Sequence, residues 1–303
     1  MRFKLAAFTA LVLMAFALTF PAASRQAAAQ SADPTGDHLR GLMGQVNAQL
    51  EATGAPYRAD YAEYITDAES SHEAGQIVFF ANVGNKQIPA HFVPGDPRRG
   101  GASNITYIVD QAEGNVDSLT TAQTTAAIDR AMATWDDANC SHLPITALPN
   151  IPAVDLGIVE FINGLGGTPF VFADITHAGW VPAGTFPPGV IAVTFTFVFT
   201  GPGGPTDIDN NGKADVAFRE ILYHDAFPWN VNGNIDVETI ALHEAGHGLS
   251  QDHFGTLFQT TSNGKFHFSP RAVMNAGYTG IQQRLLGSDN AGHCSIWGSW
   301  PNN

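Results

Sequence analysis

The stretch His243–His253, with the sequence HEAGHGLSQDH, brings three histidines and one glutamate close together in the chain. Residues four positions apart lie on the same face of a helix, so the imidazoles of His243 and His247 can reach one metal ion. Glu244 then lies beside this ion, where a carboxylate can act as a general base. His253 follows beyond the expected end of the helix and adds a third ligand. Three protein ligands with an open fourth position are typical of catalytic zinc sites.

This stretch resembles the long zinc signature of the metzincin metalloendopeptidases, HExxHxxGxxH, with one departure. Ser250 stands at the position where the family has glycine. Glycine lets the chain leave the helix with a positive φ, a conformation that costs other residues about 1–2 kcal/mol. Two alternatives follow: Ser250 accepts this cost, or the helix ends earlier, at Gly248. The placement of His253 depends on this turn, whereas the HExxH part does not.

The resemblance covers roughly residues 104–300 and is closest to the matrixins. It implies an α+β fold: a twisted mixed β-sheet with one antiparallel edge strand, an active-site helix and a methionine turn. Met274 is the only methionine after His253 and matches that turn, where it would support the metal site by packing. The edge strand, either 190–200 or 216–226, would pair with an extended peptide substrate through backbone hydrogen bonds.

What the resemblance implies for function is a secreted zinc-dependent endopeptidase with one catalytic zinc ion. His243, His247 and His253 would hold the zinc, and Glu244 would activate a water that attacks the peptide carbonyl. Two alternatives stay open. The first is a catalytically silent, metal-dependent binding protein on the same fold. The second is a chance HExxH in a secreted structural or surface-layer protein, which predicts no stoichiometric zinc.

The N-terminus has the pattern of a signal peptide, residues 1–29. Two basic residues precede an apolar run, Leu5–Phe20, which is too short for a stable membrane span. Small residues favour cleavage after Ala29, with Ala23 as the alternative. Cleavage after Ala29 removes three basic residues and no acid, so the formal charge changes from -14 to -17. We expect a secreted protein, extracellular or periplasmic, with no stable membrane insertion after signal removal.

Composition limits the partners. Charged residues make up 14% of the chain and the formal charge is -14, which argues against nucleic acid and anionic membranes as partners. Protein or peptide substrates remain, and we expect a monomer. The chain has two cysteines, Cys140 and Cys294. An exported chain with an even cysteine count favours one disulfide between them, and two buried free thiols are the alternative.

Residues 30–100 precede the part that resembles the family, which we place at 101–303 as the catalytic domain. The segment is either a propeptide or a small N-terminal region. Apolar spacing predicts a helix over 37–51 and strands at 77–80 and 88–92. Arg98-Arg99 follows Pro and Gly residues in a turn-rich stretch, and on a flexible loop it favours proteolytic processing.

Hydrophobic periodicity predicts further elements downstream. The expected strands are 104–110, 154–162, 190–200 and 216–226, and the expected helix is 120–138. The aromatic residues Phe195, Phe197 and Phe199 alternate along one of these strands, as they would on one face of a sheet. Asp236 is placed to cap the zinc-binding helix.

A loop before the fourth strand carries oxygen side chains at alternate positions. Asp207, Asp209, Asn211 and Asp215 surround a glycine, as in the first half of a calcium loop, but the later bidentate glutamate is replaced by Phe218. The loop therefore predicts either a short structural calcium site or a solvated Asx-rich turn.

Overall fold

The computed structural model describes residues 34–67, 77–79, 88–112, 116–117, 119–260 and 262–302. The predicted signal peptide lies outside these ranges. Residues Pro34–Asn303 belong to one compact unit. Among the described residues, no helix has the length and apolar character needed to cross a membrane.

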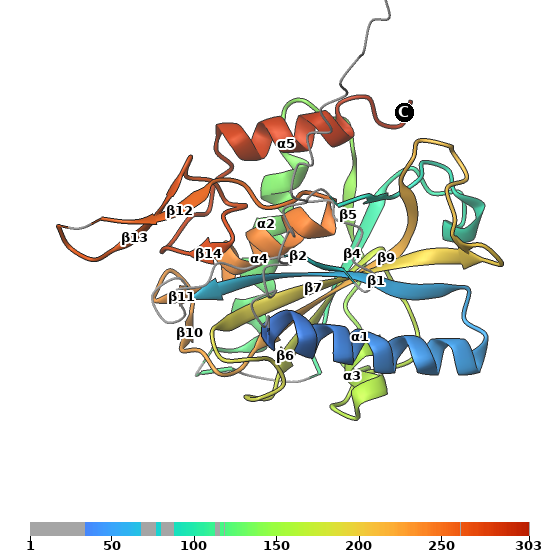
Figure 1. The fold of residues 1–303 in the computed structure, drawn as a ribbon, viewed down its shortest axis with the longest axis horizontal. Coiled ribbons are helices and arrows are strands. Elements are labelled where there is room, and N and C mark those ends of the chain that lie inside the picture. Colours follow the sequence, from blue (N-terminus) through green and yellow to red (C-terminus); the bar gives the residue numbers. More distant parts are fainter. Residues whose placement is uncertain are drawn as a thin grey trace, which may run out of the picture. The chain divides into compact units, whose positions relative to one another are not determined.

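Runs of strands are separated by a few helices along the chain, and the sheet is mixed, which makes the fold α+β (Figure 1). The helices are α1 (Pro34–Thr53), α2 (Thr121–Asp136), α3 (Ile158–Asn163), α4 (Val237–Gly248) and α5 (Gly287–Trp297), with a 3-10 turn η1 (Pro97–Arg99). The strands are β1 (Tyr57–Asp67), β2 (Ile77–Phe79), β3 (Ala90–His91), β4 (Ile105–Val109), β5 (Ile145–Ala147), β6 (Ile175–Val181), β7 (Val190–Gly201), β8 (Gly204–Pro205), β9 (Ala214–His224), β10 (Trp229–Asn230), β11 (Ile235–Asp236), β12 (Thr256–Gln259), β13 (Phe266–Ser269) and β14 (Gly277–Tyr278).

One mixed sheet organises these elements, with the strand order β14-β1-β7-β9-β6-β4-β5. The pairs β9-β6, β6-β4 and β4-β5 are parallel, whereas β7 is antiparallel to both of its neighbours. Strand β14 is parallel to β1. The prediction of a mixed sheet in an α+β fold is therefore confirmed.

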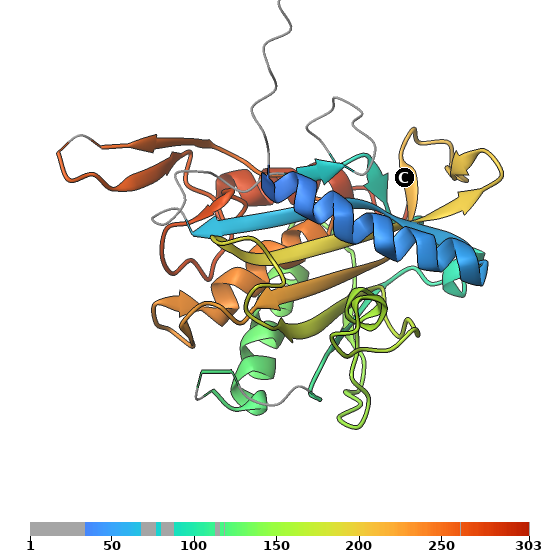
Figure 2. The ribbon, with the colours of Figure 1, turned by 60° about the horizontal axis from the view of Figure 1, so that its bottom comes forward.

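Helices cover both faces of this sheet (Figure 2). Helix α1 buries Leu39, Met43 and Val46 on one face, in a cluster that also contains alternate side chains of β1 and β7. Helices α2 and α4 pack on the other face in a second cluster. The predicted aromatic stripe lies in the α1 cluster, which confirms that it is one face of the sheet.

The prediction that 190–200 or 216–226 forms the open edge strand of the sheet is wrong. Strand β1 pairs with β7 over most of its length, from the pair Tyr57–Phe199 to the pair Thr66–Val190. Strand β9 lies between β7 and β6. The antiparallel strand is therefore internal, because the chain supplies its own neighbour at the place where an edge was expected.

The N-terminal segment is part of the folded unit. Residues 34–67 form α1, which lies on a face of the sheet, and β1, which is one of its strands. Residue 100 is therefore not a boundary between compact units. Arg98 and Arg99 do not lie on a flexible loop. They belong to η1, where Arg98 pairs with Asp96 and Asp215 and the nearly buried Arg99 pairs with Asp174. Cleavage at this site stays a prediction.

The strand predicted at 154–162 is wrong, because the segment contains the short helix α3. Gly157 precedes the helix with φ 130°, and Gly164 ends it in the left-handed region. The Glu220 carboxylate accepts hydrogen bonds from the backbone amides of Ile158 and Val159. A distant side chain thus satisfies the helix start, and apolar periodicity over so short a run does not separate helix from strand.

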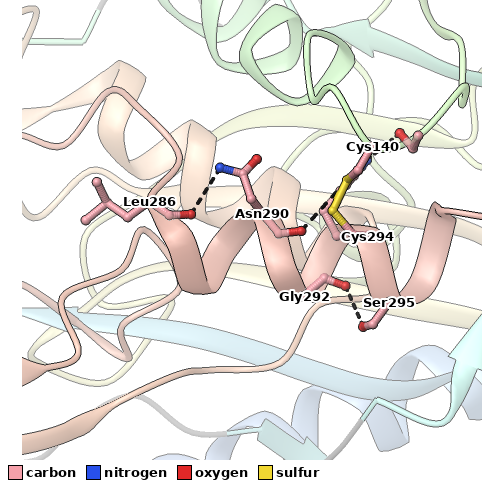
Figure 3. The surroundings of a disulfide bond; sticks show 8 residues. Cys140, Leu286, Asn290, Gly292, Cys294 and Ser295 are labelled. Atoms are coloured by element: carbon pink, nitrogen blue, oxygen red, sulfur yellow. Dashed lines mark hydrogen bonds between the residues drawn. A yellow bond between two sulfur atoms is a disulfide. The ribbon is translucent and has the colours of Figure 1, made fainter.

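The predicted disulfide joins Cys140 to Cys294, with Cα atoms 5.5 Å apart (Figure 3). Cys140 follows the end of α2 and Cys294 lies in α5. The bond therefore attaches the C-terminal helix to the side of the molecule that carries α2 and α4, which pack against each other.

Candidate metal centre

Helix α4 carries the first two predicted ligands. Its start is capped by Asp236, whose carboxylate accepts a hydrogen bond from the amide of Thr239, as predicted. Every residue of the helix is buried, because the sheet, α2 and the segment around Met274 surround it. A helix held on all sides leaves His243 and His247 little freedom, and this favours a fixed ligand geometry.

The turn after α4 combines the two alternatives for Ser250. The helix ends at Gly248, and Ser250 has φ 69°, so the serine does adopt the left-handed conformation expected of glycine. The buried guanidinium of Arg219 holds this turn, since its Nη1 donates to the Gly248 carbonyl at 2.7 Å and to the Ser250 hydroxyl at 3.0 Å. The turn brings His253 back to the helix.

The three histidines converge through their Nε2 atoms. These lie 3.1 Å apart between His243 and His247, 3.0 Å between His247 and His253, and 3.3 Å between His243 and His253. Zinc–nitrogen bonds of about 2.0–2.1 Å in a tetrahedral arrangement would separate the nitrogens by about 3.3–3.4 Å. The described spacing is therefore close to that of three imidazoles sharing one zinc ion.

Hydrogen bonds to the backbone fix the tautomers of two of these rings. Nδ1 of His243 donates to the Val273 carbonyl at 2.7 Å, and Nδ1 of His247 donates to the Gln251 carbonyl at 2.8 Å. With the proton on Nδ1, each ring directs the lone pair of Nε2 toward the shared point. Burial lowers the pKa of His243 to about 4 and that of His247 well below its usual range, which favours the neutral, ligating form.

Glu244 lies in the same interior with its carboxylate only partly satisfied. Oε2 accepts a hydrogen bond of 2.5 Å from the hydroxyl of Thr194 on β7. Oε1 is buried and has no hydrogen-bond partner within the described part of the chain. Burial raises the pKa of Glu244 well above its usual range. A buried acceptor without a partner, next to three converging imidazoles, fits a site that also takes a metal ion and a water molecule.

Met274 packs against α4, and its role as a methionine turn stays a prediction. It is fully buried, and a Cβ added at Gly246 would overlap its sulfur. Asp289 at the start of α5 holds the segment from below, because its carboxylate accepts hydrogen bonds from the amides of Val273 and Met274. The same segment supplies the Val273 carbonyl that orients His243, so α5 supports the site indirectly.

A cavity of about 600 Å³ lies beside the turn that follows α4. Ser250, Gln251, Asp252 and Phe254 form one wall, and residues of α5 form another. The cavity is next to the site and does not include the three histidines among its lining residues.

The predicted calcium loop brings three of its acids together. One carboxylate oxygen from each of Asp207, Asp209 and Asp215 lies within 4.8 Å of the others. Other groups of the protein also satisfy these acids: Asp207 accepts hydrogen bonds from backbone amides of the loop, and Asp215 pairs with Arg98 of η1. Asn211 donates to Asp209 through its side-chain amide. These contacts are those of an Asx-rich turn, and calcium binding stays a prediction.

Four residues around the site were not predicted from the sequence: Glu63, Thr194, Arg219 and Asp289. Each reaches the site from another part of the chain, and none belongs to a local motif. The alternation of polar and apolar residues in β7 was a usable signal for one of them. Thr194 points to α4, whereas Phe195 beside it points to α1.

No protein-family model matches this chain, and no curated protein matches it.

Proposed function

We propose that this protein is a zinc-dependent hydrolase of peptide bonds in protein substrates, a secreted endopeptidase with Glu244 as its general base. The observation that supports the proposal best is the convergence of three Nε2 atoms within 3.3 Å of one another beside an acid that is one residue from the first ligand. His243, His247 and His253 would hold the zinc. When bound, zinc lowers the pKa of a water molecule and polarises the peptide carbonyl.

Glu244 would take the proton of the attacking water and later deliver it to the leaving amine. Its carboxylate is held by the Thr194 hydroxyl through Oε2, which leaves Oε1 for this proton transfer. The buried surroundings raise the pKa of Glu244, and a raised pKa suits a group that must both accept and release a proton. A nearby zinc ion would act in the opposite direction and favour the carboxylate form.

The alternative function, a metal-dependent binding protein without catalysis, is favoured by one observation. Strand β1 already pairs with β7, so an extended peptide has no free edge there in the folded chain. The two functions differ in the need for Glu244, because a binding protein does not require a general base.

Cleavage of a casein-type substrate by wild type and Glu244→Gln, with zinc content measured for both, tests the proposal. The amide cannot accept a proton, so we expect retained zinc and turnover reduced by about 10²–10⁴-fold. A zinc chelator should abolish wild-type cleavage. Turnover of Glu244→Gln near the wild-type rate would exclude the mechanism. Stoichiometric zinc without cleavage by any form of the protein would favour the binding function.

A further inference from the structure

The cavity beside the turn that follows α4 has no part in the proposed hydrolysis, since neither Glu244 nor the three histidines line it. Its volume of about 600 Å³ lies within the range of about 300–1,000 Å³ that is usual for pockets that hold small molecules. The turn and α5 form two of its walls. Ile88 and His91 near β3, with Lys213 before β9, complete the third. The cavity therefore has the size and the enclosure of a ligand site.

Gln251 brings a buried polar group to this cavity. The residue is 1% exposed, and neither Oε1 nor Nε2 of its carboxamide has a hydrogen-bond partner among the residues that the structure describes. Its backbone groups are satisfied, because its amide donates to the Gly246 carbonyl at 2.9 Å and its carbonyl accepts from Nδ1 of His247 at 2.8 Å. A buried amide without partners costs free energy. The side chain of Gln251 is therefore suited to a partner from outside the fold.

Gly292 on α5 makes room for this carboxamide. A Cβ at position 292 would lie 2.5 Å from Oε1 of Gln251 and 2.7 Å from the Phe254 ring, and all three residues line the cavity. Figure 3 shows Gly292 and Ser295 on a different side of α5 from Cys294, which forms the disulfide. The carboxamide thus lies where the turn and α5 meet at the cavity wall, with the ring of Phe254 beside it.

The charges on the cavity walls favour a neutral ligand. Among the lining residues that the structure describes, Lys213 and Asp252 carry one charge of each sign. His91 also lines the cavity, and burial lowers the pKa of its imidazole to about 4, so this ring is neutral at pH 7. The lining has no net charge, and an ion that enters an enclosed site without an opposite charge loses hydration that nothing replaces.

We propose that this cavity binds a carboxamide, the uncharged group at the end of glutamine and asparagine side chains, and that Gln251 recognises it. A carboxamide carries both a donor and an acceptor. The ligand N–H donates to Oε1 of Gln251, and the ligand carbonyl accepts from Nε2. The methylene groups of the ligand pack on Phe254. The site requires neither a metal ion nor Glu244, so the inference does not rest on the proposed function.

The test measures binding of N-acetyl-glutamine N-methylamide to the full chain by ligand-observed NMR. We expect Gln251→Leu to bind this probe at least about tenfold more weakly than wild type, because leucine leaves the ligand carboxamide without partners. The corresponding methionine probe, similar in shape but without the carboxamide, should bind wild type at least about tenfold more weakly than the glutamine probe. Gln45→Leu, the same exchange at an exposed position of α1, is the matched control and should bind the glutamine probe as wild type does.

A second variant, Ala291→Phe, narrows the cavity from α5 and leaves the turn unchanged. We expect it to weaken binding of the glutamine probe as well, which covers the case in which Gln251→Leu does not fold. Equal affinity of wild type and Gln251→Leu for the glutamine probe would overturn the proposal, and so would equal affinity of wild type for the two probes. Absence of binding at the solubility limit of the glutamine probe would also overturn it and would show that the carboxamide of Gln251 takes only water.

Free glutamine, titrated in parallel, separates two sources of the same group. Tighter binding of free glutamine than of the blocked probe would identify a free amino acid as the ligand, whereas tighter binding of the blocked probe would identify a side chain within a peptide. Both results support a carboxamide site. None of these outcomes bears on hydrolysis, because that proposal is tested by cleavage with Glu244→Gln.

Discussion

At the scale of the residue, the turn after α4 accommodates a serine at position 250, where the zinc signature has glycine. Ser250 takes a left-handed conformation, φ 69°, at a cost of about 1–2 kcal/mol for a non-glycine residue. The Ser250 hydroxyl offsets part of this cost, because it accepts a hydrogen bond from the buried guanidinium of Arg219. Glycine could adopt the same φ without strain but would leave this donor with one partner fewer.

Gly246 is the residue in α4 whose size matters most for the site. A Cβ there would overlap the sulfur of Met274 and lie 3.0 Å from the Trp135 ring. We expect Gly246→Ala to lower the free energy of unfolding by about 1–3 kcal/mol, the usual cost of overpacking, and to weaken zinc binding. Urea unfolding and zinc competition measure these effects. Gly248→Ala is the control, since its Cβ would meet only the flexible Ile175 side chain, at 3.1 Å. Equal losses in both variants would contradict the explanation.

At the scale of the element, α1 and β1 decide how the sheet is completed. Together they cover one face of β7 with apolar side chains and occupy its outer edge. The aromatic residues of that face, Phe195 and Phe197, are fully buried in the cluster to which α1 contributes. The N-terminal segment is therefore a structural part of the same unit as the candidate metal centre.

Because α1 belongs to the same folded unit, a substitution in its buried face should destabilise the whole unit. Met43 is fully buried in the α1 cluster, so Met43→Ala should lower the free energy of unfolding by about 2–5 kcal/mol. We expect a single unfolding transition whose midpoint shifts to lower urea concentration, as monitored by near-UV circular dichroism. Gln45→Ala, at an exposed position of the same helix, should change stability by less than about 0.5 kcal/mol. If Met43→Ala produced a separate early transition and left the main one unmoved, the segment would be an independent module.

At the scale of the whole molecule, several buried histidines make stability depend on pH. His177 on β6 is fully buried and hydrogen-bonded to the Tyr223 hydroxyl at 2.7 Å. Burial lowers its pKa to about 3, whereas an unfolded chain titrates histidine near 6.5. Below this pH the unfolded chain binds a proton that the folded protein does not. The contribution of His177 is therefore fully present above pH 6.5 and is lost as the pH falls toward 3.

Removal of His177 should reduce this dependence. In metal-free protein, each such histidine contributes a slope of about 1.4 kcal/mol per pH unit between its two pKa values. We expect His177→Gln to lose about 2 kcal/mol less stability than wild type between pH 7 and pH 5, measured by urea unfolding. Identical losses in the two proteins would show that His177 is not held neutral by the fold.

Local signals in the sequence were enough to predict much of the fold and to bring the candidate metal ligands together. Helical spacing predicted α1, α2 and α4, and the long β-branched run predicted β7. The spacing of His243, Glu244 and His247 depends only on helix geometry, so the sequence placed these side chains together before any tertiary contact was known. His253 and Ser250 also belong to one short stretch, which is why the turn could be stated as two alternatives.

Only the tertiary structure decided what lies next to these residues. Strand β1 was not predicted, because its partner β7 is more than a hundred residues away along the chain and register follows from packing. The helix α3 replaced an expected strand because Glu220, remote in sequence, satisfies its first amides. For the same reason the stretch His243–His253 shows which atoms can bind a metal, whereas the neighbours Thr194, Arg219 and Glu63 are set by long-range strand pairing that no local pattern encodes.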